Sequence, residues 1–208
     1  MRHSVPSNRV ALVSCHVEQP LRDETWQRFD AFQRRRPGGF DVIALMRPPD
    51  TAFGEDEQRW LVRARAAAAR ASFGLHTHWT SPTHARPTGG DPAQRVRDEA
   101  KWVRAQGLDL RLFCGGGWYS DDDVRRTVHE LDLLDCTVRE GLPGGGSVPT
   151  THSLGQLARA LPRLPPYVHA YFHDYDLLDP FRRRALAASL ALLGRRRGQL
   201  DLSAVSGR

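Results

Sequence analysis

The chain has 208 residues, of which 40% are hydrophobic and 26% charged, and its formal net charge is +6. This length suits one domain with a substantial core and is short for two, and no apolar stretch approaches the roughly 20 residues that cross a bilayer. We therefore expect one domain over residues 1–194 and a frayed tail at 195–208. We also expect a cytoplasmic protein without a membrane partner, since the first residues lack the cleavage site of a signal peptide.

Arginine carries almost all of the positive charge. Lys101 is the only lysine, whereas arginine runs occur at 34–36, 182–184 and 195–197. No recognition helix, zinc-finger spacing or RNA-binding aromatic motif accompanies these runs. We interpret them as a solvated basic surface and expect no nucleic-acid partner. The sequence leaves the oligomeric state open.

Short apolar runs alternate with longer helix-like segments along the chain. The expected strands cover residues 9–14, 41–45, 110–113, 136–138 and 167–172, and a further strand begins at Phe73. The spacing of Trp26, Phe29 and Phe32 predicts the first helix. Later helices are expected over residues 56–71, 92–106 and 154–161, and others start near Ser120 and Asp179. These repeated strand–helix units predict an α/β protein with a mainly parallel sheet, either doubly wound or closed into a barrel.

Polar residues follow these strands at the point where each strand ends. In chain order they are His16 and Glu18, Arg47, His76 and His78, Cys114, and finally His173 and Asp174. The carboxyl ends of parallel strands form the edge where ligands bind in α/β folds, because the loops that follow the strands converge there. We therefore expect a binding site or an active site at this edge.

The stretch FGLHTHWTSPTHARP, residues 73–87, places three histidines within nine positions. We expect His76 and His78 to point to opposite faces, so that one of them lies in the site. We expect His84 either to fold back toward His76 or to face solvent. Imidazoles bind zinc and other divalent transition metals, and the carboxylate of Glu18 would complete a three-ligand set with an open position for water. The alternative is a polar loop that happens to contain histidines.

Other residues on the same edge offer proton transfer and stacking. His173 is a candidate for proton transfer, with Asp174 or Asp176 orienting the ring or its loop, and the alternative is a turn sequence before the last helix. Three aromatic residues are expected either to stack on a sugar or another ring or to cover the mouth of the barrel: Trp79, Trp118 and Tyr119.

Four motifs, in this order, resemble those of the polysaccharide deacetylase (NodB-homology) family of carbohydrate esterases. They are SCHVEQP after the first strand, GLHTHWTSPTH after the third, LFCGGGWYSDDDV after the fourth and VHAYFHDYD at the last. The resemblance covers residues 9–193 and implies an irregular (β/α) barrel with about six to seven parallel strands. It also implies hydrolysis of acetyl groups with a divalent metal, which polarises the acetyl carbonyl and lowers the pKa of its water.

Carried over to this chain, the resemblance makes His76 a metal ligand and His173 the general acid. The two aspartates of the family's first motif are missing. Glu18 is the only nearby carboxylate, and His16 stands near the position of the catalytic base.

The chain departs from the family at two further positions. Thr80 stands where the family has its second histidine ligand, which leaves His78 or His84 to replace it. Cys114 stands where the family has an arginine.

We therefore expect a metal-dependent, deacetylase-like hydrolase, with zinc as the metal, that acts on an N-acetylated sugar or a related small amide. The predicted metal ligands are Glu18, His76, His78 and His84, the catalytic residues are His16, His173 and Asp174, and the substrate-binding residues are Arg47, Trp79, Cys114, Trp118 and Tyr119. One alternative is a catalytically silent barrel that binds a carbohydrate or another ligand. The other is a metal-independent hydrolase that uses His16 and His173 directly.

Overall fold

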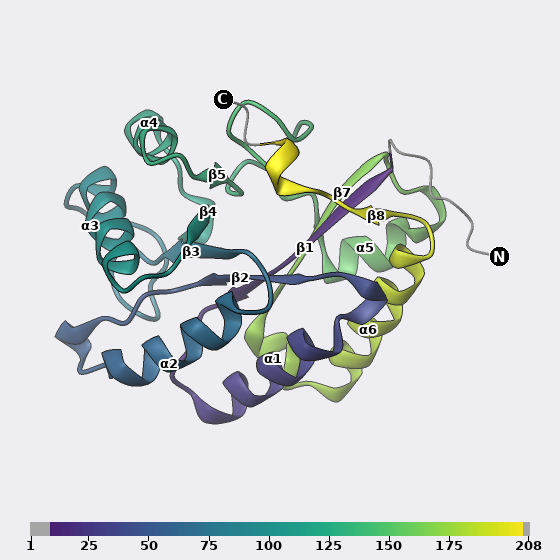
Figure 1. Cartoon of the computed structure of the whole chain (residues 1–208), viewed down its shortest axis with the longest axis horizontal. Helices are drawn as coiled ribbons and strands as arrows, with labels where there is room; N and C mark the ends of the chain where they lie inside the picture. The colour runs from purple at the N-terminus through teal and green to yellow at the C-terminus, as the bar shows by residue number, and fades with distance from the viewer. Residues whose placement is uncertain (1–8, 206–208) are drawn as a thin grey trace.

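The computed structural model describes residues 9–205, in which helices flank a single parallel sheet (Figure 1). The strands are β1 (Val10–Val17), β2 (Val42–Met46), β3 (Phe73–Thr77), β4 (Leu110–Gly115), β5 (Leu134–Asp135), β6 (His152–Ser153), β7 (Tyr167–His173) and β8 (Gly198–Gln199). Their order is β5-β4-β3-β2-β1-β7-β6, with β8 paired to β1, and all these pairings are parallel. The path of seven strands forms a curled half-barrel, so the predicted α/β, barrel-like fold is confirmed.

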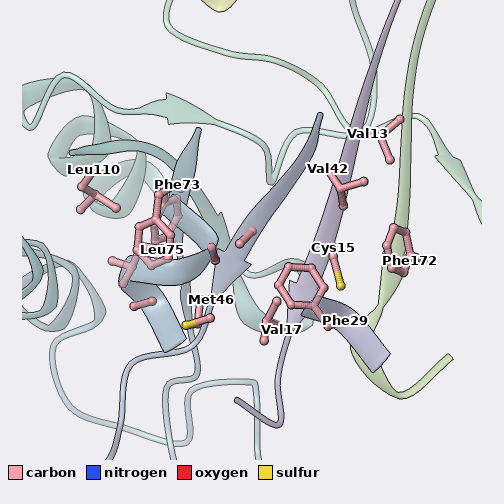
Figure 2. Packing of buried hydrophobic residues seen from close by; sticks show 14 of the residues in the cluster. Val13, Cys15, Val17, Phe29, Val42, Met46, Phe73, Leu75, Leu110 and Phe172 are labelled. Atoms are coloured by element: carbon pink, nitrogen blue, oxygen red, sulfur yellow. The ribbon is translucent and has the colours of Figure 1, made fainter. Parts of the chain in front are cut away.

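The central strands are buried on both faces. β1 reads VALVSCHV and β2 reads VIALM, which are the near-continuous apolar runs expected when helices cover one face of a parallel sheet and side chains fill the other. On the helix side, Phe29 packs in one cluster with Cys15, Val17 and Phe172 (Figure 2). A second cluster fills the inside of the curl and includes Leu12, Ile43, Leu45, Leu112, Leu134 and Val205.

Six α-helices connect these strands. They are α1 (Asp23–Arg35), α2 (Glu57–Ala68), α3 (Pro92–Ala105), α4 (Asp122–Glu130), α5 (Leu154–Ala160) and α6 (Pro180–Gly194), and α1, α2 and α6 lie along one side of the sheet in Figure 1. Asp179 caps α6 as predicted. The predicted cap of α4 was wrong by one residue, since Asp121 rather than Ser120 accepts the backbone N–H of Val124. None of the helices in residues 9–205 is long and apolar enough to span a membrane.

The segment after Gly194 packs against the sheet instead of fraying as expected. The backbone N–H of Gly198 donates to the carbonyl of Arg9 at 3.1 Å, and that of Leu200 donates to the carbonyl of Ala11 at 2.8 Å. Val205 is only 8% exposed because its side chain enters the cluster inside the curl. The described part of the predicted tail therefore packs at the amino ends of the central strands and adds Val205 to the cluster inside the curl.

The Gly- and Pro-rich loop that precedes β6 ends as an extended segment between β5 and β7. The N–H of Val148 donates to the carbonyl of Asp135 at 3.0 Å, and the N–H of Thr151 donates to the carbonyl of His169 at 3.1 Å. Residues 148–151 therefore link the two edges of the curled sheet and enclose its interior.

Candidate functional site

Strand register brings reactive side chains together at one end of the half-barrel. Side chains that face the interior alternate along each strand. In β1 and β7 the pairing sets His16 beside His173, and in β3 and β4 it sets His76 beside Cys114. Glu18 follows β1 at the same end. Residues more than 150 positions apart in the sequence thus share one site.

Glu18 lies at the centre of this group. Its Oε1 atom lies 3.4 Å from Nε2 of His76, 3.7 Å from Nε2 of His78 and 3.7 Å from Nε2 of His173. Glu18, His76 and His78 each offer one ligand atom, and these three atoms lie within 4.8 Å of one another. Two imidazole nitrogens and one carboxylate oxygen are a common zinc ligand set that leaves a coordination position open.

Hydrogen bonds behind the two rings determine their tautomers. Nδ1 of His76 lies 3.1 Å from the carbonyl oxygen of Cys114, and Nδ1 of His78 lies 2.9 Å from that of Pro82. Because a carbonyl only accepts, each Nδ1 carries a proton. In the neutral ring, Nε2 then directs a lone pair toward Glu18, whereas in the charged ring Nε2 donates to the Glu18 carboxylate. Nε2 of His78 is buried and has no hydrogen-bond partner within residues 9–205. An orphaned acceptor beside a carboxylate and a second imidazole fits a divalent metal ion.

One expectation about the histidine stretch was wrong, and one open alternative can be decided. His76 and His78 do not point to opposite faces, because residues two apart in an extended chain share a face, and their ring centroids lie 5.1 Å apart. His84 is exposed and forms a turn with Ser81, outside every potential metal-binding group in the described chain. The structure therefore brings His78, and not His84, to Glu18 and His76.

The glycines after β4 allow the chain to pass close to His78. A Cβ atom on Gly116 would lie 2.5 Å from the carbonyl oxygen of Thr77 and 3.0 Å from Cδ2 of His78, so a side chain there would displace the ring. Trp79 is buried, its indole N–H donates to the carbonyl of Gly116 at 3.1 Å, and its ring packs against Tyr119. This placement favours a packing role for Trp79 and Tyr119 over the substrate contact that the sequence predicted.

Arg47 holds the backbone of Glu18 from behind. Its Nε donates to the carbonyl oxygen of Glu18 at 3.0 Å, and its terminal nitrogens form a bidentate pair with Glu55 at 2.6 and 2.7 Å. Arg47 is 4% exposed. Substrate binding by Arg47 remains a prediction, but its burial and its hydrogen bonds to Glu18, Pro48 and Glu55 favour a role in positioning Glu18.

Asp174 supports the same loop from the other side. Its Oδ2 accepts the backbone N–H of Gln19 at 2.8 Å, and the carboxylate is fully buried. Burial raises the pKa of Asp174 to about 6. Burial also disfavours the charged form of Glu18, but contacts with His76 and His78 outweigh it and hold the pKa of Glu18 well below its usual range. Glu18 is therefore ionised at neutral pH.

His16 lies inside the curl among the other rings. Its centroid lies 4.5 Å from that of His76 and 5.1 Å from that of His173, and its Nε2 lies 3.7 Å from Sγ of Cys114. Burial, followed by the charges of His76 and His173, lowers the pKa of His16 well below its ordinary value. Burial raises the pKa of Cys114, so its thiol stays protonated. At neutral pH the imidazole of His16 is thus neutral and can accept a proton. The thiol of Cys114 is also neutral and is enclosed by protein.

Asp176, rather than Asp174, contacts His173. Oδ2 of Asp176 accepts the backbone N–H of His173 at 2.9 Å and lies 3.7 Å from Nδ1 of its ring. Tyr175 stacks on the ring with centroids 4.9 Å apart and planes 9° from parallel. The His173 side chain is 24% exposed. It is therefore oriented by neighbours and open to a substrate.

The site predicted from the sequence did not include two residues that lie beside it, Tyr171 and Arg139. Tyr171 lies 5.3 Å from His16 between ring centroids, and Arg139 stacks over Trp118. Tyr171 precedes His173 by two positions on a strand and so shares its face, a pattern that identifies it. Nothing local marks Arg139, because its aromatic neighbours come from other segments.

The chain resembles known proteins in its fold and not in its sequence. No protein-family model and no curated protein matches the chain. Among solved structures, a CE4 family pseudoenzyme from Bacillus anthracis matches 97% of this chain with a TM-score of 0.59 and 13% identity, and the chain spans 66% of that protein's length, just under two thirds. A mutant of this pseudoenzyme with restored enzymatic activity has the same TM-score and identity. A family 4 carbohydrate esterase from Streptomyces lividans, in complex with acetate, has a TM-score of 0.57, 12% identity and coverage of 95% of this chain and 96% of its own.

The likeness is one of fold. At these identities it supports the barrel implied by the motifs and carries no activity with it. A tryptophan synthase from M. tuberculosis also matches, with a TM-score of 0.50, so the architecture is compatible with unrelated chemistry. Function has to be argued from the side chains of the site.

Proposed function

We propose that the chain is a metal-dependent, deacetylase-like hydrolase that acts on an N-acetylated sugar or a related small amide. The convergence of Glu18, His76 and His78, with the lone pair of His78 Nε2 buried and unpaired, is the observation that carries the proposal. These three residues would hold the metal. When bound, a divalent ion such as zinc supplies Lewis-acid polarisation of an acyl oxygen and a lowered pKa for water.

The remaining residues of the site would supply proton transfer. His16 is neutral at neutral pH and would accept a proton from the attacking water or orient it. His173 would donate a proton to the leaving nitrogen or oxygen, with Asp176 and Tyr175 fixing its ring. Arg47 and Asp174 would keep the Glu18 loop in place.

Metal content and turnover test this proposal together. Protein purified without chelator is expected to contain about one equivalent of zinc or another divalent transition metal per chain, and His76→Ala is expected to lose it. The zinc-loaded protein is expected to release acetate from 4-nitrophenyl acetate or N-acetylglucosamine, and chelation is expected to stop the release. Less than about a tenth of an equivalent of metal, or full occupancy in His76→Ala, would refute the metal site.

One observation favours a catalytically silent ligand-binding barrel as the second candidate. In the groups of described residues that could hold a metal, Glu18 is the one carboxylate, so no second carboxylate is left to act as the catalytic base. His16 stands near the position of that base, and its lowered pKa makes it a weak base. One matching structure is itself a pseudoenzyme. Stoichiometric metal without acetate release from either probe would select this candidate.

A further inference from the structure

We propose that Arg139 selects substrates that carry a carboxylate or another anionic group, so that the natural substrate is an acidic N-acetylated compound. The inference deepens the proposed hydrolase function and rests on it. It starts from an arginine beside the site that makes no hydrogen bond or ion pair within the described part of the chain.

Arg139 is held by stacking and not by a charged partner. Its guanidinium carbon lies 4.3 Å from the ring centroid of Trp118 and 5.5 Å from that of Tyr171. Those two rings meet edge to face with centroids 5.0 Å apart. Stacking covers the face of a guanidinium and leaves its in-plane N–H groups free, in the fork geometry that matches a carboxylate or a phosphate.

The stack lies at the reacting end of the interior. Trp118 and Tyr171 lie 5.4 and 5.3 Å from His16 between ring centroids, and Tyr171 lies 5.9 Å from His173. The rings of Trp118 and Tyr171 thus lie between Arg139 and His16 and contact both.

The backbone of Trp118 supplies a second, independent observation. Trp118 has a φ of +59°, in the left-handed region that a bulky side chain rarely adopts. Such strain persists where the surrounding structure holds it and is concentrated at ligand sites. Here it presents the indole to both His16 and Arg139.

The charge of Arg139 is unusual among the arginines near the site. Arg47 is neutralised by Glu55, and Arg182 pairs with Asp176. Arg139 keeps its positive charge at an exposed position. An anion supplied by the substrate would provide the missing partner and would orient the molecule relative to His16 and His173.

Two matched pairs of probes test the inference by isothermal titration calorimetry. N-acetylglucosaminuronic acid differs from N-acetylglucosamine by a carboxylate in place of the primary alcohol, and N-acetylglycine differs from N-acetylglycinamide in the same sense. In at least one pair the acid is expected to bind about tenfold more tightly than the neutral probe, as for one charge-assisted bidentate contact. The preference is expected both with zinc and after chelation, which excludes binding of the carboxylate to metal as its source.

Variants of Arg139 test whether this residue is the source of the preference for the acidic probe. Arg139→Gln is expected to abolish the preference for the acid, and Arg139→Lys to retain part of it. Arg28→Gln is the matched control, since Arg28 is an exposed arginine on α1, and it is expected to retain all of it. Equal affinities in both pairs for the wild type, or a preference that survives in Arg139→Gln, would overturn the inference.

Acetate release separates this inference from the proposed function. Binding selectivity that depends on Arg139 without acetate release from the zinc-loaded protein would refute the hydrolase and leave the anion contact standing. Acetate release at the same kcat/KM from the acidic and neutral members of both pairs would support the hydrolase and refute the role of Arg139.

Discussion

The pair of Arg47 and Glu55 allows a sharp test of how Glu18 is positioned. Arg47→Met removes the charge but keeps an unbranched apolar chain, and it leaves the Glu55 carboxylate, 17% exposed, without its bidentate partner. Breaking a buried ion pair in this way costs about 3 to 5 kcal/mol of unfolding free energy, and we expect about 3 because Glu55 keeps some contact with water. The carbonyl of Glu18 also loses the donor that lies 3.0 Å away. Loss of such support behind a ligand weakens metal binding by about 10- to 100-fold.

Urea denaturation of metal-free protein and zinc competition against a chromophoric chelator measure the two effects separately. The double variant Arg47→Met/Glu55→Gln removes both charges and is expected to recover most of the lost stability. Because it still lacks the donor to the Glu18 carbonyl, it is expected to keep the weakened zinc affinity. Full zinc affinity in Arg47→Met, or a double variant no more stable than the single one, would show that this reasoning is wrong.

Three further predictions concern histidines. His78→Ala is expected to remove zinc binding while His84→Ala leaves it unchanged, because His78 lies beside Glu18 and His84 does not. Inductively coupled plasma analysis of the two variants checks this, and loss of zinc in His84→Ala would contradict it. His173→Gln is expected to lower kcat about 100-fold or more with little change in KM, since a general acid acts in the transition state; steady-state kinetics on an N-acetyl amide would contradict the role if kcat were unchanged. Burial lowers the pKa of His169 from 6.5 to about 4. The unfolded chain therefore takes up this proton first as the pH falls, so the stabilisation present above pH 6.5 is lost toward pH 4, by about 3 kcal/mol. His169→Gln should remove this part of the pH dependence of the unfolding free energy measured by urea denaturation, and an unchanged dependence would contradict the prediction.

Much of the fold follows from local pattern. The apolar runs of β1 and β2 identify strands without structural help, and their repetition with helices implies a parallel sheet. Period-two alternation also carries site information, because His76 and His78 must share a face, as must Tyr171 and His173. The ends of the strands cannot be predicted as well from local pattern. The first strand was expected to end at residue 14, but β1 extends to Val17 because β2 and β7 pair with it on both sides.

The sequence alone thus determined the order of the strands along the chain and the kinds of reactive group at their carboxyl ends. Only the tertiary structure decided which groups meet. The proton on Nδ1 of His78 depends on the carbonyl of Pro82, and the exclusion of His84 depends on the turn it forms with Ser81. The position of Arg139 depends on Trp118 and Tyr171, which reach it from other strands and loops. Such contacts arise from strand register and loop closure between distant segments, which local propensity does not encode.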